Sequence, residues 1–243
     1  METSEKKQLH EEIKRRGITR VVHITPVQNL KLILQNPHGL VASAYINNKD
    51  VKINDHERWD RHTGFVCCSL EYPNYYYYER VSKPILEEPS PWVVLEIDPE
   101  VICRNETRFC PTNAAFSKGA YVNKGFDWFQ QLFREDTYTS VTMFGKRTKT
   151  TSRVDGMPEN LPTDIQAEIM PFKNVPLDNI SAILFNDMEV LEQTKAELEE
   201  NKIPYPKLVF AQDILNESAY RDYQAGGDKP EETVVCEGRK NYG

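Results

Sequence analysis

The stretch Ile165-Gln166-Ala167-Glu168-Ile169-Met170 has the alternation of a β-strand and is followed by Pro171, which ends it. Successive side chains of a strand point to opposite faces, so the odd-numbered apolar residues would share one face and Glu168 would lie on the other. Glu168 is therefore predicted to be a carboxylate in mid-strand, a position where carboxylates are depleted. The pattern alone fits a solvent-facing glutamate as well as a functional one and does not decide between them.

The rest of the chain predicts a single mixed α/β domain. Strands are predicted at 21–24, 65–70, 92–97, 180–185 and 207–211, and helices at 126–133, at 188–201 and from the tyrosine run 75–78. Another helix is predicted to begin with Thr25 as N-cap and Pro26 at its first position, and to end at Gly39. Residues 44–64 and 145–164 are predicted to be long loops. We expect a polar lead-in helix over 1–17, the domain over 18–223 and a loosely held tail over 224–243.

Composition is that of an ordinary globular protein. The 243 residues are 39% hydrophobic, with a net charge of -7. The highly charged amino terminus is unlike a secretory signal, and no apolar run approaches the roughly 20 residues that span a bilayer. A cytoplasmic location without membrane contact is therefore expected. The five cysteines cannot all pair, and their spacing does not match a zinc site, so reduced thiols and no metal are expected.

Charge is unevenly distributed along the chain. The acidic net charge argues mildly against a general nucleic-acid binder. However, residues 146–153 contain four basic side chains and no acidic one: Lys146, Arg147, Lys149 and Arg153. This stretch predicts either a phosphate-binding face or an ordinary solvated loop.

Four segments, in this order, resemble the DarT family of DNA ADP-ribosyltransferases, toxins of bacterial toxin–antitoxin pairs. They are Val22-His23-Ile24-Thr25-Pro26-Val27-Gln28-Asn29-Leu30, then Asn54 to Asp60 with Cys68 to Asn74, then Pro111-Thr112-Asn113-Ala114-Ala115, and finally Gln166-Ala167-Glu168-Ile169 with Val175 to Ile180. The resemblance implies an α+β ADP-ribosyltransferase fold of two packed, mostly antiparallel sheets with flanking helices. NAD, the co-substrate, would occupy the cleft between the sheets.

The resemblance also implies roles for individual side chains. Glu168 would be the catalytic carboxylate that holds the ribose 2″-hydroxyl and stabilises the cationic sugar. His23 would bind NAD, with Thr25 and Asn29 beside it. A second catalytic residue, an arginine of the loop that closes over NAD, is expected at Arg58. Arg61 is close enough to leave that choice open and is a further NAD-binding candidate.

Single-stranded DNA is the expected acceptor, modified on thymine or guanine. Tyr72 and the basic side chains of the loop before Glu168, Lys146, Arg147, Lys149 and Arg153, are the candidate DNA contacts. Two alternatives remain: an ADP-ribosyltransferase acting on protein or RNA, and a non-catalytic nucleotide-binding module. The resemblance further implies a role as a toxin or phage-defence effector, with an antitoxin partner, such as a macrodomain protein, that removes ADP-ribose.

Overall fold

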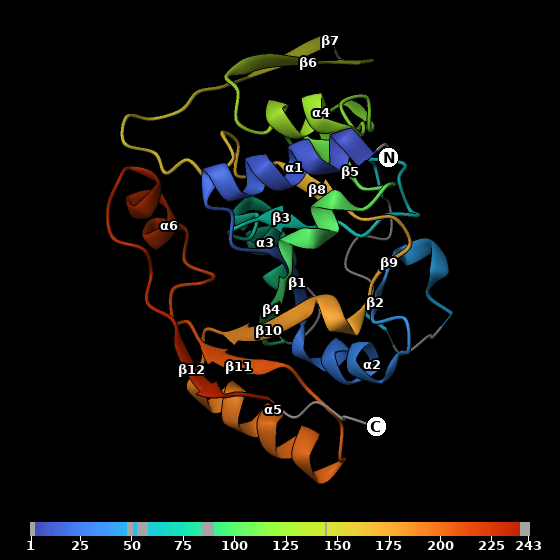
Figure 1. The fold of residues 1–243 in the computed structure, drawn as a ribbon, viewed down its shortest axis with the longest axis vertical. Coiled ribbons are helices and arrows are strands. Elements are labelled where there is room, and N and C mark those ends of the chain that lie inside the picture. The colour runs from blue at the N-terminus through green and yellow to red at the C-terminus, as the bar shows by residue number, and fades with distance from the viewer. Residues whose placement is uncertain (1–2, 48–50, 53–57, 84–89, 144, 239–243) are drawn as a thin grey trace.

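A six-stranded sheet forms the centre of the computed structural model, which describes residues 3–47, 51–52, 58–83, 90–143 and 145–238. Its strand order is β12 (Thr233–Cys236), β11 (Lys207–Phe210), β10 (Ile180–Phe185), β4 (Trp92–Ile97), β1 (Val21–Pro26) and β3 (Ser69–Leu70). Neighbouring strands are antiparallel except β10 and β11, which are parallel and are joined through helix α5 (Met188–Glu200) (Figure 1).

Both faces of this sheet are covered, which explains why β4 and β10 are almost continuously apolar. Alternate residues enter two different cores. Val93, Leu95 and Ile183 pack in the larger core. Val94 and Leu184 pack in a second core on the opposite face, with tyrosines of α3 (Tyr75–Ser82) and α6 (Glu217–Gln224).

A second layer consists of short antiparallel pairs. These are β5 (Arg108–Cys110) with β8 (Glu168–Met170), β2 (Leu40–Val41) with β9 (Asn174–Val175), and the hairpin β6 (Asp136–Thr142) with β7 (Gly145–Thr151). The bridges Cys68↔Ile169 and Phe65↔Phe172 connect β8 and the chain after it to the segment that leads into β3. The predicted α+β, mostly antiparallel fold is confirmed, with its second sheet divided into these pieces.

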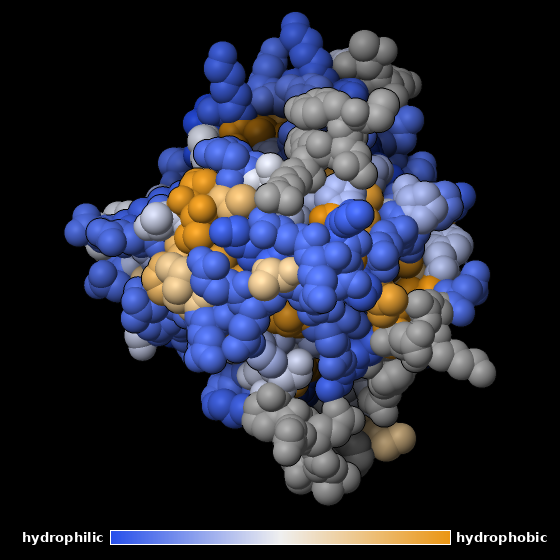
Figure 2. Space-filling model, turned by 90° about the horizontal axis from the view of Figure 1, so that it is seen from below, coloured by the Kyte–Doolittle hydropathy of each residue, from blue (hydrophilic) through white to orange (hydrophobic). Residues whose placement is uncertain are grey.

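Helices flank the two layers. Besides α3, α5 and α6, they are α1 (Thr3–Arg16), α2 (Leu30–Gln35) and α4 (Phe126–Gln131), with 3-10 turns η1 (Val27–Asn29), η2 (Ser43–Tyr45), η3 (Pro99–Cys103), η4 (Ala114–Ser117) and η5 (Leu177–Asn179). The face that carries α5 is largely hydrophilic (Figure 2). Over the described residues, none of the helices has the length and apolar character needed to span a membrane.

Several predicted elements differ from the observed ones. Of the predicted strand 65–70, only Ser69–Leu70 forms a strand, β3. Thr25 is still part of β1, and Pro26 precedes η1, so the helix begins later than predicted. The strand around Glu168 begins at Glu168 itself, because Asp164 to Ala167 form a turn in which the Ala167 amide bonds to the Asp164 carbonyl. The predicted loop 145–164 begins with seven residues of strand β7.

The carboxyl-terminal segment contributes to the main sheet. Residues 224–243 were expected to form a loosely held tail, yet β12 pairs with β11. Glu232, just before β12, lies 2.8 Å from the guanidinium of Arg20, whose side chain is 2% exposed. All five cysteines are free thiols.

Candidate active site

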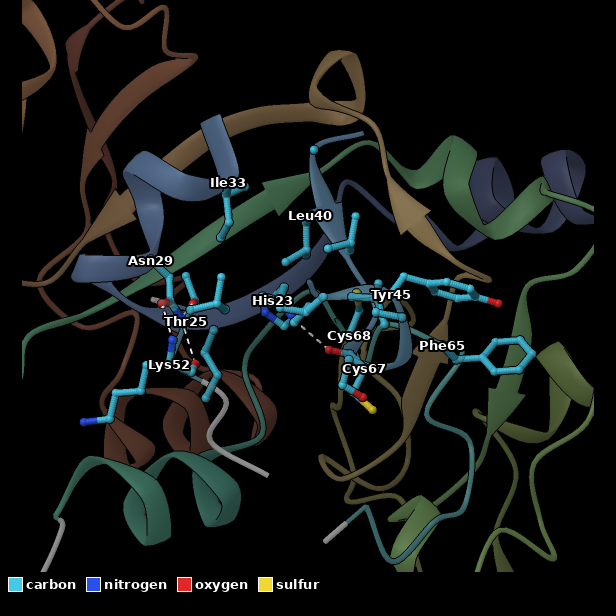
Figure 3. A pocket seen from close by; sticks show the side chains of 18 of the residues that line it. His23, Thr25, Asn29, Ile33, Leu40, Tyr45, Lys52, Phe65, Cys67 and Cys68 are labelled. Carbon is cyan, nitrogen blue, oxygen red and sulfur yellow. Dashed lines mark hydrogen bonds between the residues drawn. The ribbon is translucent and has the colours of Figure 1, made fainter. Parts of the chain in front are cut away.

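A cavity of about 540 Å³ lies between the main sheet and the second layer. It is lined by residues of β1, α2, the segments 39–47, 51–52 and 58–69, the start of α3, η4 and β8. Its size is within the range of small-molecule sites. His23, Thr25 and Asn29 line it (Figure 3), and so do Arg58 and Glu168, which are far from them in the sequence.

The His23 side chain reaches the cavity because it alternates with the core residues Val22 and Ile24 along β1. Its Nδ1 donates a hydrogen bond of 2.9 Å to the Cys67 carbonyl (Figure 3). Burial lowers the pKa of His23. The ring is therefore held neutral, with Nδ1 protonated and Nε2 an acceptor.

Asn29 and Thr25 form a small polar network at one end of the cavity. The Asn29 side chain accepts from the amide of Lys52 at 2.9 Å and donates to the carbonyl of the same residue at 3.0 Å. It also donates to Thr25 Oγ1 at 3.1 Å (Figure 3). Asn29 thus pairs with the backbone of Lys52 much as a neighbouring strand would, which places Lys52 on the cavity wall.

Glu168 is the carboxylate at the first residue of β8, and its Oε1 accepts the Ala114 amide N–H at 2.8 Å. Burial raises the pKa of Glu168 to about 7, and the negative charge of Asp60 acts in the same direction. The Ala114 amide, the Cys67 thiol and the Arg58 guanidinium oppose this rise. Such a carboxylate changes its charge near neutral pH, which is typical of functional sites.

Arg58 lies on the cavity wall, whereas Arg61 is exposed and does not line it. The Arg58 guanidinium is 9% exposed and forms a bidentate ion pair with Asp60, with Nε–Oδ1 at 3.0 Å and Nη2–Oδ2 at 2.8 Å. Nη2 also donates to the His62 carbonyl at 2.6 Å. Nη1 donates to the Phe65 carbonyl and Ser43 Oγ, each at 3.2 Å. The structure therefore brings Arg58, rather than Arg61, into the site.

Tyr72, a sequence candidate for DNA contact, is fully buried and packs on Tyr220 and Tyr223. It offers no surface to a substrate, so that role does not follow from its position. Within the run 72–78, the tyrosine that lines the cavity is Tyr77, with the guanidinium of Arg80 over its ring at 5.2 Å. The sequence could not separate these rings, because which side of α3 faces the cavity depends on how the helix packs.

The four basic candidates near the β6–β7 hairpin divide into two pairs. Lys146 and Arg147 are exposed on β7, in the hairpin at the top of Figure 1. Lys149 forms an ion pair of 2.5 Å with the buried Asp164. Arg153 donates to the carbonyls of Leu161 and Pro158, each at 2.9 Å. The first pair can reach a ligand, and the second pair holds the chain that leads to β8.

Sequence reasoning missed several residues of the site. Asp60 and Cys67 line the cavity, and so do Asn113 and Ala115, on either side of the Ala114 amide that binds Glu168. The sequence contained two hints of these residues. The segment 111–115 belongs to the family-like pattern, and Asp60 lies two residues after Arg58. Their contacts with Glu168 and Arg58 depend on chain pairing that no local pattern contains.

Comparisons with known proteins agree with this arrangement. The family model described as "ssDNA thymidine ADP-ribosyltransferase, DarT" matches residues 22–215. No curated protein matches the chain. The solved structure "Thermus sp. 2.9 DarT in complex with NAD+" is 17% identical with a TM-score of 0.51, and the match covers 80% of this chain and 96% of that one.

A second structure, "Thermus sp. 2.9 DarT in complex with ADP-ribosylated ssDNA", is 16% identical with a TM-score of 0.52, and the match covers 81% of this chain and 96% of that one. At this identity both structures support the fold alone. The family match extends from β1, which carries His23, through β8, which carries Glu168, to Leu215, just after β11. The chain therefore belongs to the DarT family of ADP-ribosyltransferases.

Proposed function

We propose that this DarT family member transfers ADP-ribose from NAD to a base of single-stranded DNA and releases nicotinamide, with Glu168 as the catalytic carboxylate. The observation that carries the proposal is the position of Glu168. It lies on the wall of the cavity that His23 also lines, and its pKa is raised to about 7. The family description and the Thermus complexes with NAD+ and with ADP-ribosylated DNA support the choice of both substrates.

The reaction exchanges one bond at C1″ of the nicotinamide ribose for another. The bond from C1″ to nicotinamide breaks, and nicotinamide leaves with the bonding electrons. A nitrogen of the base then bonds to C1″ and releases its proton to solvent. The ionised Glu168 carboxylate accepts a hydrogen bond from the ribose 2″-hydroxyl and stabilises the positive charge that develops on the sugar.

The cavity has the side chains that NAD requires. His23 Nε2 can accept a ribose hydroxyl, because Nδ1 is engaged by the Cys67 carbonyl. Lys52 and Arg80 line the cavity and provide positive charge for the pyrophosphate. Apolar side chains including Ile33, Leu40 and Tyr45 can pack on the rings. Thr25 and Asn29 act indirectly, because their hydrogen bonds hold Lys52 in its position on the cavity wall.

Thymine is the base that the family description favours, with guanine as the alternative. The exposed Lys146 and Arg147 are the proposed phosphate contacts. We further propose a role as a toxin or phage-defence effector whose antitoxin partner removes ADP-ribose. That role rests on family membership.

The decisive experiment is incubation with labelled NAD and oligonucleotides each enriched in one base, followed by mass spectrometry of the modified nucleoside. We expect labelled thymidine with the wild type. Glu168→Gln should lower nicotinamide release by a factor of about 100 or more, as the loss of such a group does. Equal release by the variant would refute the assignment of Glu168, and label on added protein or RNA instead of DNA would refute the acceptor.

A further inference from the structure

Asp164 is a buried carboxylate to which the proposed chemistry gives no role. The residue is 7% exposed, and its side chain has three partners. Oδ1 accepts the Gln166 amide N–H at 3.0 Å, whereas Oδ2 accepts the Thr112 hydroxyl at 2.6 Å and pairs with Lys149 Nζ at 2.5 Å. Burial of a carboxylate is costly unless donors of this kind surround it. Asp164 therefore holds three segments of the chain together at one point.

Two of these segments determine the position of Glu168. The Asp164 carbonyl accepts the Ala167 amide at 2.8 Å, which closes the turn that immediately precedes Glu168. Thr112 lies two residues before Ala114, whose amide binds Glu168 Oε1 at 2.8 Å. Asp164 thus connects the turn before β8 with the segment that leads into η4, and both of these elements contact the catalytic carboxylate or carry it.

The third segment is the β6–β7 hairpin. Lys149 lies on β7, the strand that also carries the two proposed phosphate contacts, and its side chain is 28% exposed. The other strand of the hairpin is attached at Thr139, whose amide donates to the Tyr121 hydroxyl and whose carbonyl accepts from it, each at 2.8 Å. Of these two attachments, the Lys149–Asp164 ion pair is the one that leads to the turn before Glu168.

Transfer and hydrolysis of NAD depend differently on the hairpin. In transfer, a base nitrogen has to reach C1″ of the ribose that Glu168 holds, so the position of bound DNA relative to Glu168 affects the rate. In hydrolysis, water bonds to C1″ in place of the base nitrogen and loses a proton, and free ADP-ribose forms without DNA. A misplacement of about 1 Å between reacting groups can cost about 100-fold in rate. A link between the hairpin and Glu168 should therefore matter more for transfer than for hydrolysis.

We propose that Asp164 is a positioning residue that fixes the β6–β7 hairpin relative to Glu168, so that DNA bound on the hairpin presents its base to the ribose. The carboxylate performs both halves of this task. Its bond to the Gln166 amide supports the turn before Glu168, and its pair with Lys149 holds the hairpin. This inference rests on the proposed function.

Asp164→Asn and Lys149→Gln test the link to the hairpin. The asparagine oxygen can still accept the Gln166 amide, but the neutral side chain no longer forms an ion pair with Lys149. With labelled NAD and a thymidine-rich oligonucleotide, we expect kcat for DNA labelling to fall about tenfold more than kcat for nicotinamide release without DNA. The double variant should be no worse than the poorer single variant, because both changes remove the same interaction.

Two results would overturn the proposal. Equal losses of DNA labelling and nicotinamide release in Asp164→Asn would mean that the residue only maintains the fold. Loss of labelling in Lys149→Gln with wild-type labelling in Asp164→Asn would mean that Lys149 acts on DNA without Asp164. Asp164→Ala also removes the acceptor of the Gln166 amide, so this variant should lose nicotinamide release as well.

Matched controls come from α1 and η3, which do not line the cavity. Asp98 accepts the amide N–H two residues after it at 2.8 Å, as Asp164 does, but it is exposed. Lys6 pairs with Glu100 at 2.9 Å across two segments that are distant in the sequence. Asp98→Asn and Lys6→Gln should leave both activities unchanged. Circular dichroism and thermal melting confirm that each variant is folded.

Amide hydrogen exchange measures the positioning without turnover. We expect Asp164→Ala to accelerate exchange at Gln166 and Ala167, and Lys149→Gln to accelerate it over residues 150–163, with little change in the central strands of the main sheet. Unchanged exchange in both variants would overturn the proposal. Accelerated exchange in a protein whose wild type releases no nicotinamide would instead contradict the proposed function, so the two failures are distinguishable.

Discussion

Burial sets the ionisation of Glu168, the side chain on which the proposed chemistry depends. Its pKa of about 7 lies above the ordinary value of about 4.3 for a glutamate in an unfolded chain. The folded state therefore binds the proton more tightly than the unfolded state. Folding stability is highest at low pH with respect to this group, and it falls as pH rises from about 4.5 through 7.

Glu168→Gln should remove this pH dependence. We expect the variant to be more stable than the wild type by on the order of 1–3 kcal/mol at pH 8, and equal to it near pH 4.5. Urea unfolding at both pH values measures the difference, with Glu217→Gln on α6 as the control. A gain of the same size at both pH values would show that the effect is not the cost of the buried charge.

Among the individual residues of the site, the sequence predicted those that belong to a short motif. His23, Arg58 and Glu168 line one cavity, as expected of a single site. Tyr72 was misplaced because the direction in which an aromatic side chain points along 72–78 depends on the packing of α3 against α6. Asp60 was missed because a carboxylate two residues from an arginine forms no recognisable sequence motif. The ion pair between them depends on the backbone turn at residues 58–61.

The 3-10 turn η4, which carries the Ala114 amide that binds Glu168, ends in a turn at Lys118. Gly119 follows this turn with φ 82°, and an added Cβ would overlap the Asp60 carbonyl oxygen. Gly119→Ala should therefore destabilise the protein by about 2–4 kcal/mol, since it adds a steric clash to the cost of a positive φ. Gly17→Ala is the matched control: its φ is 67° with nothing within 4 Å of the added Cβ, and about 1 kcal/mol is expected. Equal losses in urea unfolding would mean that Gly119 is not held against Asp60.

The β6–β7 hairpin is the element proposed to contact DNA. Reversing the charges of Lys146 and Arg147 should raise KM for the oligonucleotide about tenfold. The dependence of this KM on salt concentration should weaken by an amount that corresponds to the loss of about one to two phosphate contacts. Both side chains are exposed, so the melting temperature and nicotinamide release without DNA should not change. Charge reversal at Lys14 and Lys207, which are exposed and outside the hairpin, is the control. An unchanged salt dependence would exclude the hairpin as the phosphate contact.

Elements with strong local signals were predicted with nearly their observed ends. Strand 180–185 and the helix from Met188 agree with β10 and α5, because each combines an apolar pattern with a boundary residue such as Asp187. The short strands of the second layer were harder to predict, since two or three paired residues contain too little periodicity. The hairpin strand β7 consists of a glycine and polar residues, so its sequence resembles a loop.

An ion pair connects the segment that leads into β1 with the segment that leads into β12. Arg20, just before β1, is 2% exposed and pairs with Glu232, just before β12. Ending the chain after Ala225 removes both β12 and this carboxylate, leaving Glu96 at 3.4 Å as the guanidinium's remaining ion-pair partner among the described residues. We expect a loss of about 2–4 kcal/mol in unfolding free energy, as for other buried pairs that lose one partner.

Thermal melting of the truncated protein tests this expectation. A chain ending at Gly238, which keeps β12, is the control and should melt like the wild type. Glu232→Gln separates the ion pair from the strand and should show a smaller loss than the truncation. A truncated protein with wild-type stability would mean that the residues after Ala225 are loosely held, as predicted for the tail 224–243.

Fold class followed from the sequence because strand and helix patterns and the family-like segments agree. The order of the strands could not be predicted, because the sequence pattern of β4 does not indicate that β1 and β10 are its neighbours in the sheet. The division into a lead-in helix, a domain and a tail stays a prediction. The contact between Arg20 and Glu232 joins the domain to the last of these parts.

Because β8 and β10 come late in the chain, the order of synthesis determines when the site exists. A ribosome-bound nascent chain that ends before β8 already contains His23 but lacks Glu168, the proposed catalytic carboxylate. It also leaves β4 without β10, its neighbour in the sheet. The proposed activity can therefore arise only once most of the polypeptide has left the ribosome, and fragments from interrupted translation before Glu168 would be inert towards DNA.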